Sequence, residues 1–261
     1  MEKIYFITKR MSVQMQRLLM MMATILMAFA TLTACDILED NNDEGGKEEE
    51  GGNGGGGGIV SGKRVKSIVT TCSNPVMYSR TESIYNSSGQ CIRGETYDAS
   101  SKLIDTSIST YNSDGTLAKT VTDQGETVAE FIYFYNSNKI LQKSEHNFYQ
   151  GGVLKQTTKS EYTYENGKKI RQKSYMEGQS DYNEFLFNYD GNGRRTTTVQ
   201  TYYGDNLVFS MTHTRTYNTD GTVQKITHPV NFVDNTPVTI TFTWENGKDA
   251  TLYMFDMVNP W

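Results

Sequence analysis

The chain contains few prolines, cysteines and histidines: four, three and three among 261 residues. Three cysteines are too few for a disulfide scaffold. His146, His213 and His228 have no second ligand at the spacing of a metal site, so we expect no bound metal and three half-exposed strand residues. The sequence also lacks a Gly-x-Ser-x-Gly elbow, a phosphate-binding loop and a Cys/His pair. We therefore expect neither a cofactor nor an enzymatic activity.

The chain also lacks an excess of positive charge, with 25 Lys and Arg against 30 Asp and Glu. The net charge of the whole chain is −5. Most of the excess acid lies in residues 36–58, which leaves residues 59–261 close to neutral. A domain that binds nucleic acid needs a basic face that displaces counterions from the phosphates. We therefore expect no nucleic-acid partner.

Long apolar runs are absent apart from residues 18–34. The basic residues that precede this run are Lys3, Lys9, Arg10 and Arg17. A basic region, a short apolar segment and a small-residue exit indicate a secretory signal peptide. A helix needs about 20 apolar residues to span a bilayer, so cleavage is favoured over a permanent span.

The apolar run ends in Leu32-Thr33-Ala34-Cys35, which resembles the lipobox of bacterial lipoproteins. The resemblance implies that residues 1–34 are a lipoprotein signal peptide and that Cys35 receives acyl chains such as palmitate on its thiol and its new amine. One acyl chain binds a membrane only marginally, whereas two or more hold it stably. The alternative is an ordinary signal peptide in which Cys35 is incidental.

Residues 35–58 comprise Cys35 and a segment that holds eight acidic residues, one lysine and a glycine run. The segment has no apolar periodicity, which predicts a disordered tether with a reach of about 25 to 30 Å. An acidic run after a lipidated cysteine resembles the export signal of surface-displayed lipoproteins in some Gram-negative bacteria. In other lineages Asp after the cysteine marks retention at the inner membrane, and a plain solvated spacer is a third alternative. We expect a surface-exposed protein anchored in the outer membrane.

Residues 59–261 repeat a turn motif that begins with an aromatic residue, as in Tyr189-Asp190-Gly191-Asn192-Gly193. Asp or Asn opens such a turn through its side chain, and Gly accepts the positive φ of a hairpin turn. The leading aromatic residues recur every 24 to 29 residues, which is long enough for two strands and two turns. These residues, the aromatic row, are Tyr85, Tyr111, Tyr135, Tyr164, Tyr189, Tyr217 and Trp244.

The segments between the turns are rich in Thr, Tyr, Val, Ile and Phe, which favour strands. We predict an all-β domain of about fifteen strands, joined in sequence as an antiparallel up-and-down meander. A sheet of this size hides its edges by curling, so we predict a closed or strongly coiled barrel-like sheet. Residues 153–164 are polar on both strand faces, so we do not expect this sheet to cross a bilayer.

A meander places the whole aromatic row at one end of the sheet, because its turns are two strands apart. Two interpretations remain open. The row is either the core layer that closes one end of the barrel or an exposed platform on which sugar rings stack. The second interpretation makes all seven aromatic residues candidate binding residues.

The turn motif resembles the Tyr-Asp repeats of large bacterial shell-forming toxins and wall proteins, and Tyr189 to Arg194 match it best. The layout of residues 60–261 more nearly resembles a family of uncharacterised lipoproteins with a porin-like β fold. Both resemblances rest on turn residues, so they imply a fold and not an activity.

Two further pairs of residues carry weaker predictions. Glu130 and Glu184 lie beside aromatic residues and are weak candidates for the paired carboxylates of a glycan hydrolase. Cys72 and Cys91 are expected at opposite ends of strands about 30 Å long, whereas a disulfide requires Cα atoms within about 7 Å. We therefore predict no disulfide between them.

The sequence as a whole predicts a lipid-anchored, non-catalytic binding or adhesion module of the cell envelope. The expected partners are the membrane, through the lipid on Cys35, and a glycan or an envelope protein. An accessory or structural subunit of an outer-membrane assembly is the alternative, and a glycan hydrolase is less favoured.

Overall fold

The computed structural model describes residues 63–71, 79–204, 207–229 and 237–246. These residues form fourteen β-strands and no helix, so this part of the chain holds no helix able to cross a membrane. The strands are β1 Lys63–Thr71, β2 Ser79–Tyr85, β3 Cys91–Tyr97, β4 Leu103–Tyr111, β5 Leu117–Asp123, β6 Thr127–Tyr135, β7 Leu141–Gln150, β8 Val153–Glu165, β9 Lys168–Met176, β10 Tyr182–Tyr189, β11 Arg195–Gly204, β12 Leu207–Tyr217, β13 Val223–His228 and β14 Val238–Asn246.

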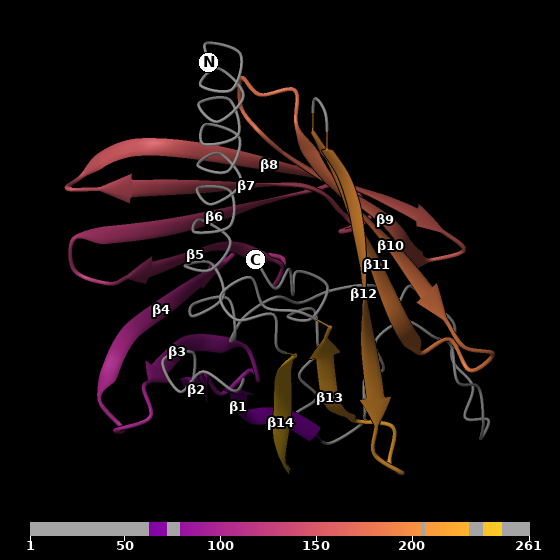
Figure 1. Ribbon diagram of the computed structural model, residues 1–261. Helices are drawn as coiled ribbons and strands as arrows, with labels where there is room; N and C mark the ends of the chain where they lie inside the picture. The colour runs from indigo at the N-terminus through magenta and orange to yellow at the C-terminus, as the bar shows by residue number, and fades with distance from the viewer. Residues whose placement is uncertain (1–62, 72–78, 205–206, 230–236, 247–261) are drawn as a thin grey trace, which may run out of the picture.

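The fourteen strands form one closed barrel in sequence order (Figure 1). Each strand pairs with the strands before and after it, and β1 pairs antiparallel with β14. The closing register runs from Lys63 opposite Asn246 to Thr71 opposite Thr239. Closure pairs the backbone groups that the first and last strands would otherwise expose. The predicted fold class, an antiparallel up-and-down meander that is closed or strongly coiled, is confirmed, and of the two alternatives the structure has the closed barrel.

The repeated motif forms the turns that the sequence predicts. In the first copy, the Asn86 side chain accepts hydrogen bonds from the backbone N–H groups of Ser88 and Gln90, both at 2.9 Å. Gly89 follows with a φ of 85°, which a residue with a Cβ rarely adopts. Asp190 and Gly193 repeat this arrangement between β10 and β11, where the φ of Gly193 is 76°. The local turn chemistry therefore fixes where each strand ends.

A β-bulge accompanies every residue of the aromatic row. The register shifts beside Tyr85 in the β2–β3 pair, for example, so that Tyr85 lies opposite Cys91. Such a bulge reverses the alternation of faces, and the residue opposite each aromatic residue becomes buried. We call these seven buried residues the inner ring; each is at most 5% exposed, and they are Val65, Cys91, Leu117, Leu141, Lys169, Arg195 and Val223.

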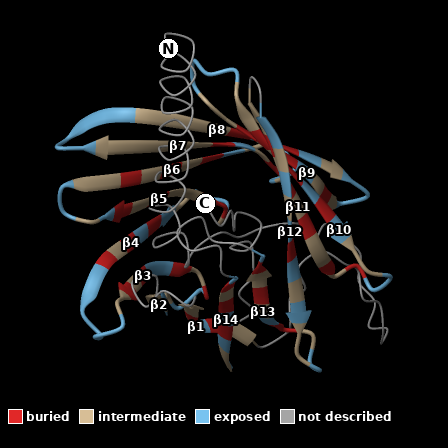
Figure 2. Cartoon of the chain, in the orientation of Figure 1, coloured by how far each residue is buried: buried red, intermediate tan, exposed pale blue. Residues whose placement is uncertain are grey.

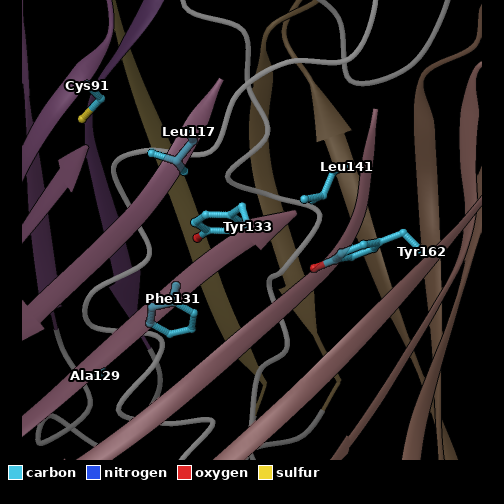
Figure 3. Packing of buried hydrophobic residues seen from close by; sticks show 7 residues of the cluster. All are labelled: Cys91, Leu117, Ala129, Phe131, Tyr133, Leu141 and Tyr162. Atoms are coloured by element: carbon cyan, nitrogen blue, oxygen red, sulfur yellow. The ribbon is translucent and has the colours of Figure 1, made fainter. Parts of the chain in front are cut away.

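Two hydrophobic clusters pack beside the aromatic row. The first lies on β3 and β5–β8 and contains Cys91, Leu117, Ala129, Phe131, Tyr133, Leu141 and Tyr162 (Figure 3). The second lies on β1, β13 and β14 and contains Val65, Ile68, Val223, Ile226, Ile240 and Phe242. Buried positions recur along most strands, as Figure 2 shows, because alternate side chains face the barrel interior. Apolar burial therefore concentrates on two sectors of the wall.

The opposite faces of the strands carry ion pairs. Lys119 on β5 contacts Glu130 on β6 at 3.0 Å. Arg171 on β9 contacts Glu184 on β10 at 2.5 Å. Each of these four side chains alternates with buried neighbours along its strand, so the pairs lie on the outer face. Exposed pairs of this kind contribute little stability, about 0 to 1 kcal/mol each, but they make the outer face polar.

Candidate functional site

The aromatic row lies at one end of the barrel, as predicted. All seven residues are near the ends of even-numbered strands, and these strands all end on the same side of an up-and-down barrel. Each residue of the row is half-buried. Tyr85, Tyr111, Tyr135 and Tyr164 pack against the first cluster, and Tyr217 and Trp244 pack against the second. The row is therefore a half-exposed layer at the rim of both clusters.

The polar atoms of five of the seven residues in the row connect one repeat to the one before it. The Tyr111 hydroxyl donates to the backbone carbonyl of Cys91 at 2.8 Å, and the Trp244 indole donates to that of Val223 at 2.8 Å. Tyr85, Tyr189 and Tyr217 donate to the carbonyls of Val65, Lys169 and Arg195. Every acceptor belongs to the inner ring. These bonds give the row a structural role, whether or not its rings also contact a ligand.

Cations cover the rings of three residues in the row. The Arg64 guanidinium lies 4.6 Å from the centre of the Tyr85 ring. Lys168 lies 5.5 Å from the Tyr189 ring centre, and Arg194 lies 5.1 Å from that of Tyr217. A cation at this distance is attracted to the ring face and occupies the surface on which a sugar would stack. The cations therefore weaken these three rings as stacking candidates.

Two members of the inner ring are cations, which the sequence analysis did not anticipate. Lys169 and Arg195 are each 2% exposed and occupy the positions that Leu117 and Leu141 hold in earlier repeats. The Lys169 ammonium lies 4.5 Å from the Tyr162 ring centre. The Arg195 guanidinium lies 4.2 Å from the ring centre of Phe187. Aligning the repeats on their turns would have revealed both cations as inward-facing.

Polar side chains line much of the barrel interior. Thr81 pairs with Thr96 across β2 and β3, and Ser109 pairs with Thr120 across β4 and β5, both at 3.0 Å. Similar pairs join Ser144 to Tyr162 and Ser160 to Ser174, both at 2.8 Å. A hydroxyl can donate one bond and accept two, so a paired hydroxyl keeps capacity for a further partner. The interior is therefore lined by hydroxyl groups on β2–β5 and on β7–β9.

Asp105 is a buried carboxyl among the hydroxyl groups of β2–β5. It lies on β4 opposite Thr96 and is 4% exposed. Burial raises the pKa of Asp105 to about 6, against smaller lowering contributions from the Thr96 hydroxyl and the Gln124 amide. The Asp105 side chain therefore changes its charge near neutral pH.

The prediction of three half-exposed histidines is wrong for two of them. His213 is 2% exposed and His228 is fully buried, because both lie on the inner face of the β12–β13 hairpin. Their Nδ1 atoms are 2.6 Å apart. His146 is half-buried, as expected, and its ring stacks on Phe131 with a centroid distance of 4.1 Å. Counting the register outward from the turn at residues 218–222 without the bulge beside Tyr217 would place His213 opposite Thr227, so the sequence did not reveal the pair.

Glu130 and Glu184, the weak hydrolase candidates, do not form a catalytic pair. They lie on β6 and β10, which are four strands apart. Neighbouring strands are about 4.8 Å apart, so this separation is well beyond the 9.5 Å limit for paired catalytic carboxylates. Glu130 binds Lys119 and Glu184 binds Arg171 on the outer face. Burial raises the pKa of Glu130, but Lys119, Asn147 and Tyr149 outweigh this and the net shift is downward.

Several sequence predictions concern residues outside the described ranges. Cys35, the signal peptide and the tether all precede residue 63, and Cys72 lies in the gap between β1 and β2. The lipidation of Cys35 and the absence of a disulfide between Cys72 and Cys91 therefore stay predictions. Among the residues that the structure describes, His, Cys, Asp and Glu form no group of three that could hold a metal ion.

No protein family and no curated protein matches the chain. Among solved structures, the chain is similar to a porin-like protein from Bacteroides uniformis ATCC 8492, with 13% identity and a TM-score of 0.39 over 72% of this chain and 97% of that chain. It is also similar to TcdB2-TccC3, with 12% identity and a TM-score of 0.29, and to TcdB2-TccC3-TEV, with 12% identity and a TM-score of 0.27. These two matches cover 65% and 67% of this chain but only 12% and 13% of the other chains.

Proposed function

We propose that this protein is a lipid-anchored, non-catalytic binding module of the Gram-negative cell envelope, and that its barrel interior holds a hydroxyl-rich ligand such as a glycan. Cys35 would carry the lipid, and residues 36–58 would hold the barrel away from the outer-membrane surface. The observation that carries the proposal is the polar lining of a fourteen-stranded closed barrel.

Barrel size supports a ligand in the interior. The side chains of a barrel with about eight strands can fill it, whereas barrels of 16 to 18 strands enclose a channel. Fourteen strands fall between these two cases. The inward residues of this wall, such as Ser107, Ser109 and Thr122, are small and polar. Each is at most 6% exposed, so a ligand would reach them only when the groups that cover them move. Their hydroxyl groups would suit the hydroxyl groups of a sugar.

The outer face supports a barrel that stands in water beside the membrane. A barrel embedded in lipid needs an apolar outer band about 25 Å tall. Ion pairs between Lys119 and Glu130 and between Arg171 and Glu184 lie on the strand faces where such a band would be. Desolvating these charges in hydrocarbon would cost several kcal/mol each. Attachment through a lipidated Cys35 requires no such desolvation.

A glycan array tests the proposed function. The domain from Gly62 onward, labelled and free of the tether, would be applied to arrays of bacterial and host glycans. We expect selective retention by glycans that share one hydroxyl-rich motif, with binding competed by the free sugar. An array without selective binding would contradict a glycan ligand.

The second candidate function, an accessory subunit of an outer-membrane assembly, is favoured by an apolar group on the outer face. Ile84, Ile92 and Ile108 lie on the neighbouring strands β2, β3 and β4 and are 41%, 37% and 55% exposed. Arg93 pairs with both Ile84 and Ile108 in the sheet and follows Ile92 on β3, so the three isoleucines surround Arg93 on the outer face. A blank glycan array would shift the assignment toward this alternative.

A further inference from the structure

His213 and His228 form a buried pair across the β12–β13 hairpin. Thr214 lies opposite Thr227, so continuing the register by one residue places His213 opposite His228 on the inner face. Their rings meet at 68° with centroids 4.5 Å apart, and their Nδ1 atoms are 2.6 Å apart. Both residues are at most 2% exposed. One Nδ1 atom must therefore donate a proton to the other.

Two amide side chains set the direction of this hydrogen bond. Gln200 donates from Nε2 to Asn183 Oδ1 at 3.1 Å, which turns its Oε1 toward His213 Nε2 at 3.2 Å. His213 Nε2 thus carries a hydrogen and its Nδ1 is the acceptor. His228 then donates from Nδ1, and its buried Nε2 is an unprotonated atom with no hydrogen-bond partner among the described residues. Both rings are neutral in this arrangement.

The charged groups nearest the pair are cationic. Arg215 follows two residues after His213 on β12, and its charge acts on both rings. On β11, Gln200 faces the pair, and the inner-ring residue Arg195 lies nearer the aromatic end. The residues on β13 and β14 that face the interior here are Ile226, Val238 and Ile240. No carboxylate occupies an inward position on β11–β14 within the described part of the chain.

We propose that the His213–His228 pair is an acid-sensitive latch, which holds β12 and β13 together in the barrel wall at neutral pH and lets this part of the wall open on acidification. The closed latch can accept a proton only at His228 Nε2, where the imidazolium would be buried beside Arg215 with no carboxylate. Opening breaks the Nδ1–Nδ1 hydrogen bond and exposes both rings to water, where each ring takes up one proton. A buried unpaired charge costs several kcal/mol, so acid favours the open state.

The electrostatics agree in sign with this geometry. Burial, with a smaller contribution from Arg215, lowers the pKa of His213 to about 3. Burial lowers the pKa of His228 well below its ordinary value, with further contributions from His213 and Arg215. An exposed histidine has a pKa near 6.5. The latch is therefore stable above pH 6.5 and is progressively lost as the pH falls from 6.5 toward 3.

Hydrogen exchange of the full chain in detergent tests the latch. Between pH 7.5 and 5, two exposed histidines with a pKa near 6.5 favour the open state by roughly a thousandfold. After correction for intrinsic exchange, we expect the protection of β12 and β13 amides to fall by that order relative to β2 and β3, which carry no histidine. The double variant His213→Gln/His228→Gln should reduce this fall to less than about threefold. The matched variant His146→Gln should leave it unchanged.

Two results would overturn the latch. One is an equal fall in the protection of β2 and β3, and the other is an undiminished fall in the double variant. If the double variant does not fold, nitrogen-15 NMR of the histidine rings in the natural sequence decides. At pH 7.5 we expect the hydrogen on Nδ1 of His228 and on Nε2 of His213, with neither ring titrating near 6.5. A hydrogen on Nε2 of His228, or titration of either ring near 6.5, rejects the proposal.

Discussion

Single inward-facing residues decide how polar the barrel interior is. Asp105 is a carboxyl in a wall of hydroxyl groups, and Lys169 and Arg195 replace the leucines of other repeats. Asp105 follows the regular alternation of β4, but the burial of Lys169 and Arg195 follows from a bulge that reverses the strand faces. Reading strict alternation from the sequence misses such a reversal, because a one-residue shift moves every following side chain to the other face.

Replacing Asp105 with Asn should stabilise the protein at pH 7.5 and leave its stability unchanged below about pH 4. Burial raises the pKa of Asp105 to about 6 from the ordinary value of 3.8. The contribution of this group is therefore fully present below pH 3.8 and is lost as the pH rises through 6. The expected gain at pH 7.5 is about 2 to 3 kcal/mol in the free energy of unfolding, measured by urea denaturation.

The control for this change is Asp123→Asn, at the exposed end of the neighbouring strand β5. Asp123 accepts a hydrogen bond from the Gly125 N–H, which an Asn side chain also accepts. We expect its effect to stay within about 0.5 kcal/mol at both pH values. Equal effects of the two substitutions would show that the burial of Asp105 does not control its charge.

The hairpin is the element that the sequence predicts best. Asn86 to Gly89 and Asp190 to Gly193 adopt the turns that their side chains and glycines indicate, and the strands between the turns follow from Thr and aromatic content. The bulge beside each aromatic residue was not predicted, because a bulge depends on pairing between strands and not on the residues of one strand. For the same reason, the contact between His213 and His228 could not be predicted from the sequence.

Removing the hydroxyl group of Tyr111 should weaken the connection between two hairpins. This hydroxyl donates to the Cys91 carbonyl at 2.8 Å, so Tyr111→Phe leaves that acceptor without this partner. We expect the free energy of unfolding to fall by about 1 kcal/mol, measured by urea denaturation. Tyr175→Phe is the matched control, because the Tyr175 hydroxyl contacts the exposed Glu161 at 3.3 Å. A larger loss for Tyr175 than for Tyr111 would refute the structural role of the aromatic row.

At the scale of the whole molecule, the sequence predicted a meander that is closed or strongly coiled, and the pairing of β1 with β14 shows that it is closed. The sequence could not distinguish a closed barrel from a strongly coiled sheet, because that choice depends on the accumulated twist of all strands. Nor could it show which polar residues meet inside the barrel. The candidate site consequently moved from the aromatic row, whose polar atoms bind backbone carbonyls, to the hydroxyl groups of the interior.

The proposed ligand binds in the barrel interior and not on the outer face. Threonine occurs on both faces, so NMR of threonine methyl groups during titration with an array-selected glycan tests this claim most directly. If the ligand binds inside the barrel, we expect chemical-shift changes at the inward residues Thr120, Thr122 and Thr198. We expect little change at the outward residues Thr106 and Thr241. Changes confined to Thr106 and Thr241 would contradict it.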